Sequence, residues 1–223
     1  MNKSEKLQLI RETGIIAIMR AQSSPRGRGS DQLIAAADAI KAAGVRVIEV
    51  TMTTPGALAV TEEAKKRYGQ DVLFGAGTVL DAETARAAIL AGADFVVAPN
   101  LDLDTVALCN RYGVPVIPGC YTPTEMIAAW QAGADMIKLF PASVGGPDLV
   151  KAILAPLPQL EIVPVGGVDL STAAEFIRKG AVALGVGSSL VNQKLLDAGD
   201  WEELERRAAA FIAEVEKGRG HLR

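Results

Sequence analysis

The sequence predicts an α/β protein: a single (β/α)8 TIM barrel with a short N-terminal helix, forming one domain over residues 1–223. Short apolar runs alternate with amphipathic segments eight times, at a spacing of roughly 20 to 25 residues, which indicates parallel strands joined by helices. An Ala-Gly pair recurs before strands at 43–44, 91–92 and 132–133, with a looser Lys179-Gly180. The chain has 223 residues, close to the ~250 typical of such a barrel. A doubly wound open sheet is the alternative fold.

The expected strands are apolar runs bounded by glycine, proline or charged residues. Their lengths suit buried parallel strands, which read as nearly continuous apolar segments. In chain order they cover residues 15–20, 46–52, 72–78, 94–99, 115–119, 134–140, 161–167 and 182–187.

The expected helices begin at capping residues or at proline, and most end at glycine. Ser30 is expected to cap the second helix, and Pro55 to open the third. A short turn at 188–191 is expected before the last helix. In chain order the helices cover residues 4–13, 31–43, 55–68, 81–91, 102–112, 122–132, 145–154, 171–179 and 200–217.

Composition excludes several classes of function. Hydrophobic residues make up 49% of the chain, enough for a sizeable core, and the net charge of −3 shows no basic footprint for nucleic acid. No apolar run reaches the ~20 residues needed to span a bilayer, and the N-terminus does not resemble a signal peptide. Cys109 and Cys120 form neither a disulfide framework nor a metal-type pair, so we expect a reduced, cytoplasmic protein. The single histidine, His221, lies in the polar tail, which argues against His-dependent nucleophilic sites and histidine-rich zinc sites.

Lys138 is the most informative residue, because it lies within the apolar run 134–140. Strand alternation places Met136, Lys138 and Phe140 on one face, where burial would lower the pKa of the lysine. A neutral amine there can form a Schiff base with a carbonyl substrate. The alternative is a structural lysine that reaches solvent or pairs with a carboxylate.

Other polar residues lie at the ends of neighbouring strands, where such barrels carry catalytic groups. Arg20 ends the first strand, Glu49 lies near the end of the second, and Thr78 follows the third. Alternation puts Val47 and Glu49 on the same face, so Glu49 is expected to share the barrel interior with Lys138. A buried ion pair between the two is the alternative.

Two glycine-containing loops predict a phosphate site. Gly166-Gly167 follows the seventh strand, and Gly187-Ser188-Ser189 follows the eighth. The loops after strands seven and eight of this fold frequently bind phosphate. Glycines permit close approach of backbone N–H groups to an anion.

Together these motifs resemble the pyruvate aldolases of the 2-keto-3-deoxy-6-phosphogluconate and -galactonate type. The resemblance covers essentially the whole chain. The motifs that carry it are Ile18-Met19-Arg20, Ile48-Glu49-Val50-Thr51, Gly75-Ala76-Gly77-Thr78-Val79, Ala98-Pro99, Lys138-Leu139-Phe140-Pro141, Gly145-Gly146-Pro147, Pro164-Val165-Gly166-Gly167-Val168 and Gly187-Ser188-Ser189-Leu190-Val191.

The resemblance implies roles for individual residues. Lys138 would be the Schiff-base lysine and Glu49 the general acid/base, with Arg20 and Thr78 at the pyruvyl carboxylate. It also implies a keto-acid phosphate substrate, no cofactor, no metal and a homotrimer. The remaining implied contacts are Pro99, Phe140 and Val165 to the substrate, and Gly166, Gly167, Gly187 and Ser188 to its phosphate.

Several positions depart from the gluconate-type pattern. Thr53 stands where an arginine is often found, and Val165 where a threonine often precedes Gly-Gly. Val165, Cys120 and Asn100 are similar to the galactonate-type branch, so the C4 epimer preference stays open. The segment from Pro25 to Ser30 looks like an extra loop relative to the family, and it is expected to be a disordered insertion, with an engineered loop as the alternative.

Two alternative functions remain open at this stage. One is another phosphate-binding barrel enzyme, such as an isomerase or synthase, in which Lys138 would be a charged ligand. The other is a non-catalytic or engineered trimeric scaffold built on this fold. An unphosphorylated substrate such as 4-hydroxy-2-oxoglutarate is also compatible with the sequence.

Overall fold

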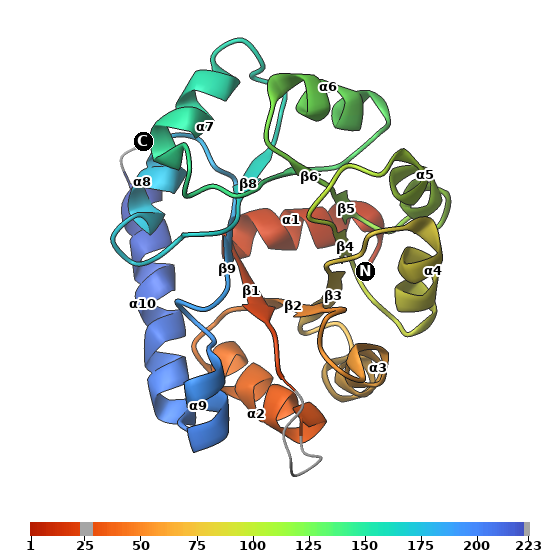
Figure 1. Ribbon diagram of the computed structural model, residues 1–223. Coiled ribbons are helices and arrows are strands. Elements are labelled where there is room, and N and C mark those ends of the chain that lie inside the picture. The colour runs from red at the N-terminus through yellow and green to blue at the C-terminus, as the bar shows by residue number, and fades with distance from the viewer. Residues whose placement is uncertain (23–28, 221–223) are drawn as a thin grey trace.

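The computed structural model describes residues 1–22 and 29–220, which form a curled parallel sheet surrounded by helices (Figure 1). Residues 25–28 of the expected insertion and the tail residue His221 lie outside this range. The second helix begins at Gly29, within the segment expected to be an insertion, so Ser30 lies inside the helix and the expectation that it precedes the helix as a cap was wrong.

The strands within the described residues all pair in parallel. One sheet has the order β5-β4-β3-β2-β1-β9, and the other has the order β6-β7-β8. The strands are β1 (Ile15–Met19), β2 (Val47–Thr51), β3 (Leu73–Gly77), β4 (Val96–Val97), β5 (Val116–Ile117), β6 (Gly119–Cys120), β7 (Ile137–Leu139), β8 (Ile162–Pro164) and β9 (Leu184–Val186).

The predicted fifth strand, 115–119, is divided into β5 and β6 at Pro118. Proline has no N–H group to donate to a sheet, which explains a break at this position. The Pro118 carbonyl still accepts a hydrogen bond of 2.9 Å from the N–H of Lys138. Elsewhere the two sheets approach each other at an isolated parallel bridge between Val165 and Gly185. The observed fold is therefore a parallel sheet curled toward a barrel.

Most helices follow a strand along the chain and lie around the outside of the curled sheet, whereas α1 lies across its centre (Figure 1). Most lie within two residues of their predicted bounds, but α9 was not predicted. The helices are α1 (Lys3–Thr13), α2 (Gly29–Ala42), α3 (Ala57–Tyr68), α4 (Ala82–Leu90), α5 (Leu103–Arg111), α6 (Pro123–Gln131), α7 (Gly146–Leu154), α8 (Ala173–Arg178), α9 (Gln193–Ala198) and α10 (Trp201–Arg219).

Two apolar layers follow from strand alternation. Outward-facing residues form the larger core with the surrounding helices. The inward-facing residues of the strands form a separate cluster, and Leu9 and Ile10 of α1 join it. Helix α1 thus closes the amino-terminal end of the sheet. Ion pairs hold it there, including Lys6 with the buried Asp94 and Lys3 with Asp135, both 3.0 Å long.

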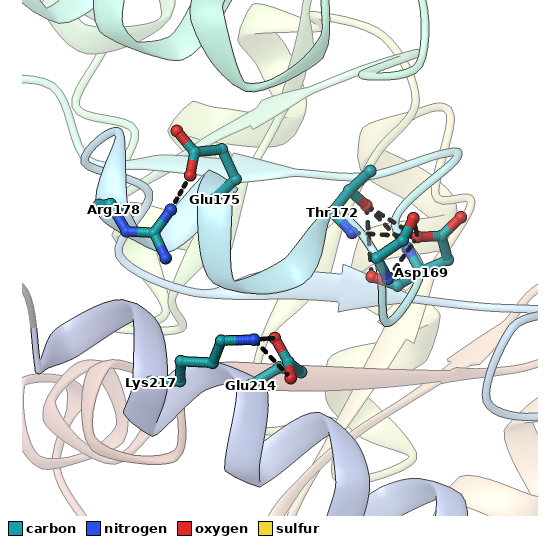
Figure 2. A network of polar contacts seen from close by, with 7 residues as sticks. Asp169, Thr172, Glu175, Arg178, Glu214 and Lys217 are labelled. Atoms are coloured by element: carbon teal, nitrogen blue, oxygen red, sulfur yellow. Dashed lines mark hydrogen bonds and ion pairs between the residues drawn. The ribbon is translucent and has the colours of Figure 1, made fainter.

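Helices α8 and α10 pack together, and Figure 2 shows polar contacts on both helices and at the turn that precedes α8. Asp169 accepts hydrogen bonds from the backbone of Thr172 at the turn that leads from β8 into α8. Glu175 pairs with Arg178 inside α8, and Glu214 pairs with Lys217 on α10. The turn at Asp169 anchors the far end of the loop that contains Gly166 and Gly167.

Among residues 1–22 and 29–220, no helix combines the length and apolarity needed to cross a membrane.

Candidate active site

Lys138 is the middle residue of β7 and is only 5% exposed. Its Nζ lies 4.9 Å from the centroid of the Phe140 ring. Burial lowers the pKa of Lys138 below its ordinary value of 10.5, and the Arg20 charge lowers it further, while Glu49 opposes the shift. The lysine is thus biased toward the neutral amine that nucleophilic attack requires.

Glu49 is the middle residue of β2 and is 2% exposed. Its carboxylate occupies space that the missing side chain of Gly77 leaves open, because a Cβ on Gly77 would lie 1.7 Å from Glu49 Oε1. Burial raises the pKa of Glu49 above 4.5, and the charges of Lys138 and Arg20 oppose that shift. Both groups therefore act on each other electrostatically.

The alternative interpretation of Lys138 and Glu49 was a structural ion pair. Within the described part of the chain, neither side chain takes part in an ion pair. Two buried ionisable groups with shifted pKa values and no direct ion pair are typical of a functional site.

A cavity of about 360 Å³ lies between the ends of β1, β8 and β9. It brings together most of the residues that the sequence assigned to the substrate and its phosphate. These are Arg20, Phe140, Val165, Gly166, Gly167, Gly187 and Ser188. Lys138 adjoins this cavity through the ring of Phe140, which is one of the lining residues.

The Gly166-Gly167 loop requires glycine at both positions. Their φ values are +87° and +83°, in the left-handed region that side chains disfavour. A Cβ on Gly167 would lie 2.5 Å from that of Ser143, so the backbone also packs closely. Within residues 1–22 and 29–220, the N–H groups of Gly167 and Ser188 donate to no backbone oxygen. Both residues line the cavity.

The structure does not bring every predicted residue to this cavity. Thr78, with φ +58°, lines a second cavity with Thr53, Thr54, Leu58 and other residues that follow β2 and β3. Thr78 and Arg20 line different cavities, and their shared contact with a carboxylate, which the resemblance implied, stays a prediction. Pro99, another predicted contact, packs its carbonyl closely against Gly119. A Cβ on Gly119 would lie 2.3 Å from the carbonyl oxygen of Pro99. Gly119 is the register partner of Lys138.

Sequence reasoning missed Asn192 and Gln193, which also line the 360 Å³ cavity. Asn192 caps α9 by accepting a hydrogen bond from the N–H of Leu195, and Gln193 is the first residue of that helix. An asparagine before an apolar helical pattern is a known start signal and could have revealed α9.

Other reactive groups lie outside the cavity. Burial raises the pKa of Cys109 to about 11 and that of Cys120 to about 12, so both thiols stay protonated and unreactive. In the part of the chain that the structure describes, no group of three or more His, Cys, Asp and Glu residues is placed to hold a metal ion.

The family model for KDPG and KHG aldolases matches residues 8–207 of this chain. The 2-dehydro-3-deoxy-phosphogluconate aldolase of Treponema pallidum is 34% identical over 201 residues, covering 90% of this chain and 91% of the relative. The 2-dehydro-3-deoxy-6-phosphogalactonate aldolase of Escherichia coli is 35% identical over 189 residues, covering 84% and 90%.

Solved structures are similar over nearly the whole chain. A native KDPGal structure has a TM-score of 0.84 at 33% identity, covering 92% of this chain and 96% of that one. The Legionella pneumophila KDPG aldolase, with pyruvate captured as a covalent carbinolamine, has a TM-score of 0.83 at 25% identity, covering 91% and 96%. A chain of a porous cage designed by fusing symmetric oligomeric domains has a TM-score of 0.85 at 31% identity, covering 94% and 74%. The chain belongs to the KDPG and KHG aldolase family.

Proposed function

We propose that the protein is a class I aldolase, a carbon–carbon lyase that uses no metal or cofactor. It cleaves 2-keto-3-deoxy-6-phosphogluconate, its galactonate epimer, or both, to pyruvate and glyceraldehyde 3-phosphate. The observation that carries the proposal is the buried Lys138 amine, with its pKa lowered, beside the buried Glu49 carboxyl. The family assignment and the carbinolamine captured in the Legionella relative support it.

In this mechanism the Lys138 amine attacks the C2 ketone of the substrate. The resulting carbinolamine loses water and becomes an iminium ion. The iminium accepts the electron pair of the C3–C4 bond as that bond breaks, which leaves an enamine and releases the aldehyde. Protonation at C3 and hydrolysis then release pyruvate and regenerate the free lysine.

Glu49 carries the protons of this cycle. Its carboxylate takes the proton from the C4 hydroxyl as the C3–C4 bond breaks, and the carboxylic acid returns a proton to C3 of the enamine. Because burial raises the pKa of Glu49, the protonated form is accessible at the second step. The neighbouring Arg20 offers a planar fork of N–H donors suited to a substrate anion.

The phosphate is proposed to bind at Gly166, Gly167, Gly187 and Ser188, which all line the 360 Å³ cavity. The available N–H groups of Gly167 and Ser188 support this assignment. Arg20 lines the same cavity, so it is placed to assist the phosphate or the carboxylate. Thr78 and Pro99 are proposed as further substrate contacts because of their positions after β3 and β4.

We further propose that the curled sheet is a closed (β/α)8 barrel, with β5 and β6 acting as one strand. Hydrogen bonds that support closure include Asp135 N–H to Val116 at 3.2 Å and Val182 N–H to Ile162 at 3.0 Å. A closed barrel would place Glu49 and Lys138 in one water-poor interior. The two buried thiols support a reducing, cytoplasmic location.

A homotrimer is the proposed assembly. Leu58 and Leu80 are exposed large apolar side chains beside the second cavity, at 37% and 53% exposure. The designed-cage relative was built from symmetric oligomeric domains, which supports self-association of this fold. Light scattering coupled to gel filtration should give three times the chain mass of 23.3 kDa, and Leu80→Asp should lower that mass. A mass of one chain would contradict the assembly.

The proposed function is tested by pyruvate release, measured with lactate dehydrogenase and NADH. Pyruvate should appear from a phosphorylated keto-deoxy sugar acid, with or without EDTA. Product analysis separates this activity from that of a barrel isomerase, which would convert a sugar phosphate without releasing pyruvate. Absence of pyruvate from both epimers and from 4-hydroxy-2-oxoglutarate would refute the assignment.

Selectivity between the C4 epimers is expected to depend on Val165, a residue 8% exposed that lines the cavity. Valine cannot donate a hydrogen bond to a substrate hydroxyl, whereas threonine of nearly the same shape can. We expect cleavage of both epimers by the wild type. Val165→Thr should shift the ratio of kcat/KM toward the gluconate epimer by roughly 0.5–1.5 kcal/mol, the net contribution of one hydrogen bond.

Measuring kcat/KM for both epimers in both proteins checks this prediction. An unchanged ratio would place the selectivity elsewhere, with Thr53 as the next candidate.

A further inference from the structure

The end of β1 is held by side chains from two other elements. The β1–β2 register ends at the pair Met19 and Val50, so Arg20 lies just beyond the ladder. The next two N–H groups then donate to side chains. That of Ala21 donates to Thr54 Oγ1 at 3.3 Å, and that of Gln22 donates to Gln193 Oε1 at 2.9 Å. Strand pairing therefore fixes the backbone before Arg20, and two side-chain hydrogen bonds fix the backbone after it.

Thr54 is itself firmly placed. It is 4% exposed, its N–H donates to the Thr51 carbonyl at 2.9 Å, and its carbonyl accepts from Ala57 at 3.1 Å. Its Oγ1 lies 3.4 Å from Thr51 Oγ1. Because Thr54 accepts from Ala21, its hydroxyl hydrogen is available to Thr51. Thr51 ends the strand that contains Glu49, so this contact ties the Arg20 segment to the Glu49 strand.

Gln193 holds the same segment from the other side. Its amide nitrogen donates to Asp197 Oδ1 at 2.8 Å, which directs its oxygen toward the N–H of Gln22. Gln22, Gln193 and Arg20 all line the 360 Å³ cavity. The Gln193 contact thus fixes the segment at the edge of the cavity itself.

We propose that Thr54 is a positioning residue that, with Gln193, holds Arg20 at the anion-binding cavity beside Lys138 and Glu49. The proposal rests on the proposed function. An exposed arginine on an untethered strand end would lose more conformational entropy when it binds an anion. Holding its backbone in advance reduces that cost. Arg20 also lowers the pKa of both Lys138 and Glu49, which agrees with a held guanidinium close to the two groups.

The test compares Thr54→Val, which removes the acceptor at nearly constant shape, with Thr54→Ser, which keeps it. Thr54→Val should raise KM roughly 3- to 10-fold, the effect of one neutral hydrogen bond, with kcat within about 2-fold of the wild type. Thr54→Ser should restore KM. Thr61→Val is the matched control, since Thr61 is also a buried threonine and its hydroxyl donates to the Ala57 carbonyl at 2.9 Å, within α3.

A double-mutant cycle separates positioning from general loosening of the fold. In the Arg20→Gln background, Thr54→Val should have no further effect on KM, because the group that it positions is already gone. The pH profile of borohydride trapping should also move to higher pH in Thr54→Val, because a displaced cation no longer lowers the pKa of Lys138. Thr61→Val should leave the profile in place. A KM effect that persists without Arg20 would overturn the proposal, and so would a Thr54→Ser variant that behaves like Thr54→Val.

Gln193→Leu provides a second test if Thr54→Val does not fold. It removes the hydrogen bond from the Gln22 N–H at a half-buried position, so it should also raise KM with little change in kcat. Calorimetric titration with inorganic phosphate and with pyruvate separates this proposal from the proposed function. If phosphate or pyruvate binds Arg20→Gln more weakly than it binds the wild type, the same anion should also bind Thr54→Val more weakly than the wild type. That comparison holds even if no substrate is cleaved, and unchanged binding of both anions in Thr54→Val would overturn the role of Thr54.

Discussion

Replacing Lys138 by alanine is expected to abolish both cleavage of the phosphorylated substrate and the adduct trapped by borohydride in the presence of pyruvate. The reason is chemical, since no Schiff base forms without the amine. Mass spectrometry of peptides should locate the wild-type adduct on Lys138. Lys151→Ala, at an exposed lysine of α7, is the control and should retain full activity and the adduct.

The pH dependence of trapping gives a second measurement on the same group. Because burial lowers the pKa of Lys138 below 10.5, trapping should reach its plateau at a lower pH than an ordinary lysine would require. An adduct on any other lysine, or cleavage by Lys138→Ala, would remove Lys138 from the mechanism.

Glu49→Gln is expected to slow turnover by about 10²-fold or more, the usual range for a lost general acid or base. Glutamine has nearly the same shape, so the space beside Gly77 stays filled. Glu63→Gln, at an exposed acid on α3, loses the same charge without touching the interior and should keep its activity. Near-normal turnover in Glu49→Gln would exclude Glu49 as the proton carrier.

The same variant should change stability in a pH-dependent way. Burial raises the pKa of Glu49 in the folded state, so folding favours the protonated acid and opposes ionisation. As the pH rises from the ordinary value of 4.5 through the folded pKa, the wild type loses this contribution and Glu49→Gln does not. The variant should therefore gain stability relative to the wild type at pH 7, and the gain should shrink toward pH 4.5. Urea unfolding at both pH values measures the difference, and an opposite trend would contradict the burial argument.

Strand periodicity was enough to predict much of this protein from its sequence. The alternation of side chains along a strand assigned Glu49 and Lys138 to the same interior, and both residues are buried in the structure, at 2% and 5% exposure. Gly166 and Gly167 were expected to allow close approach of the backbone, and both have positive φ values, which few other residues adopt. These are local properties, set by each residue and its nearest neighbours along the chain.

The sequence could not predict contacts between distant segments. Thr54 contacts Ala21 across 33 residues, and Gln193 contacts Gln22 across 171, so neither leaves a local pattern. Which cavity Thr78 and Arg20 each line depends on how the loops after β1, β2 and β3 pack. Local patterns were therefore sufficient to predict that Glu49 and Lys138 lie in the interior, because alternation is a property of the strand alone. Which residues share a cavity, and which side chains contact the segment after Arg20, depend on the packing of whole elements and so required the folded structure.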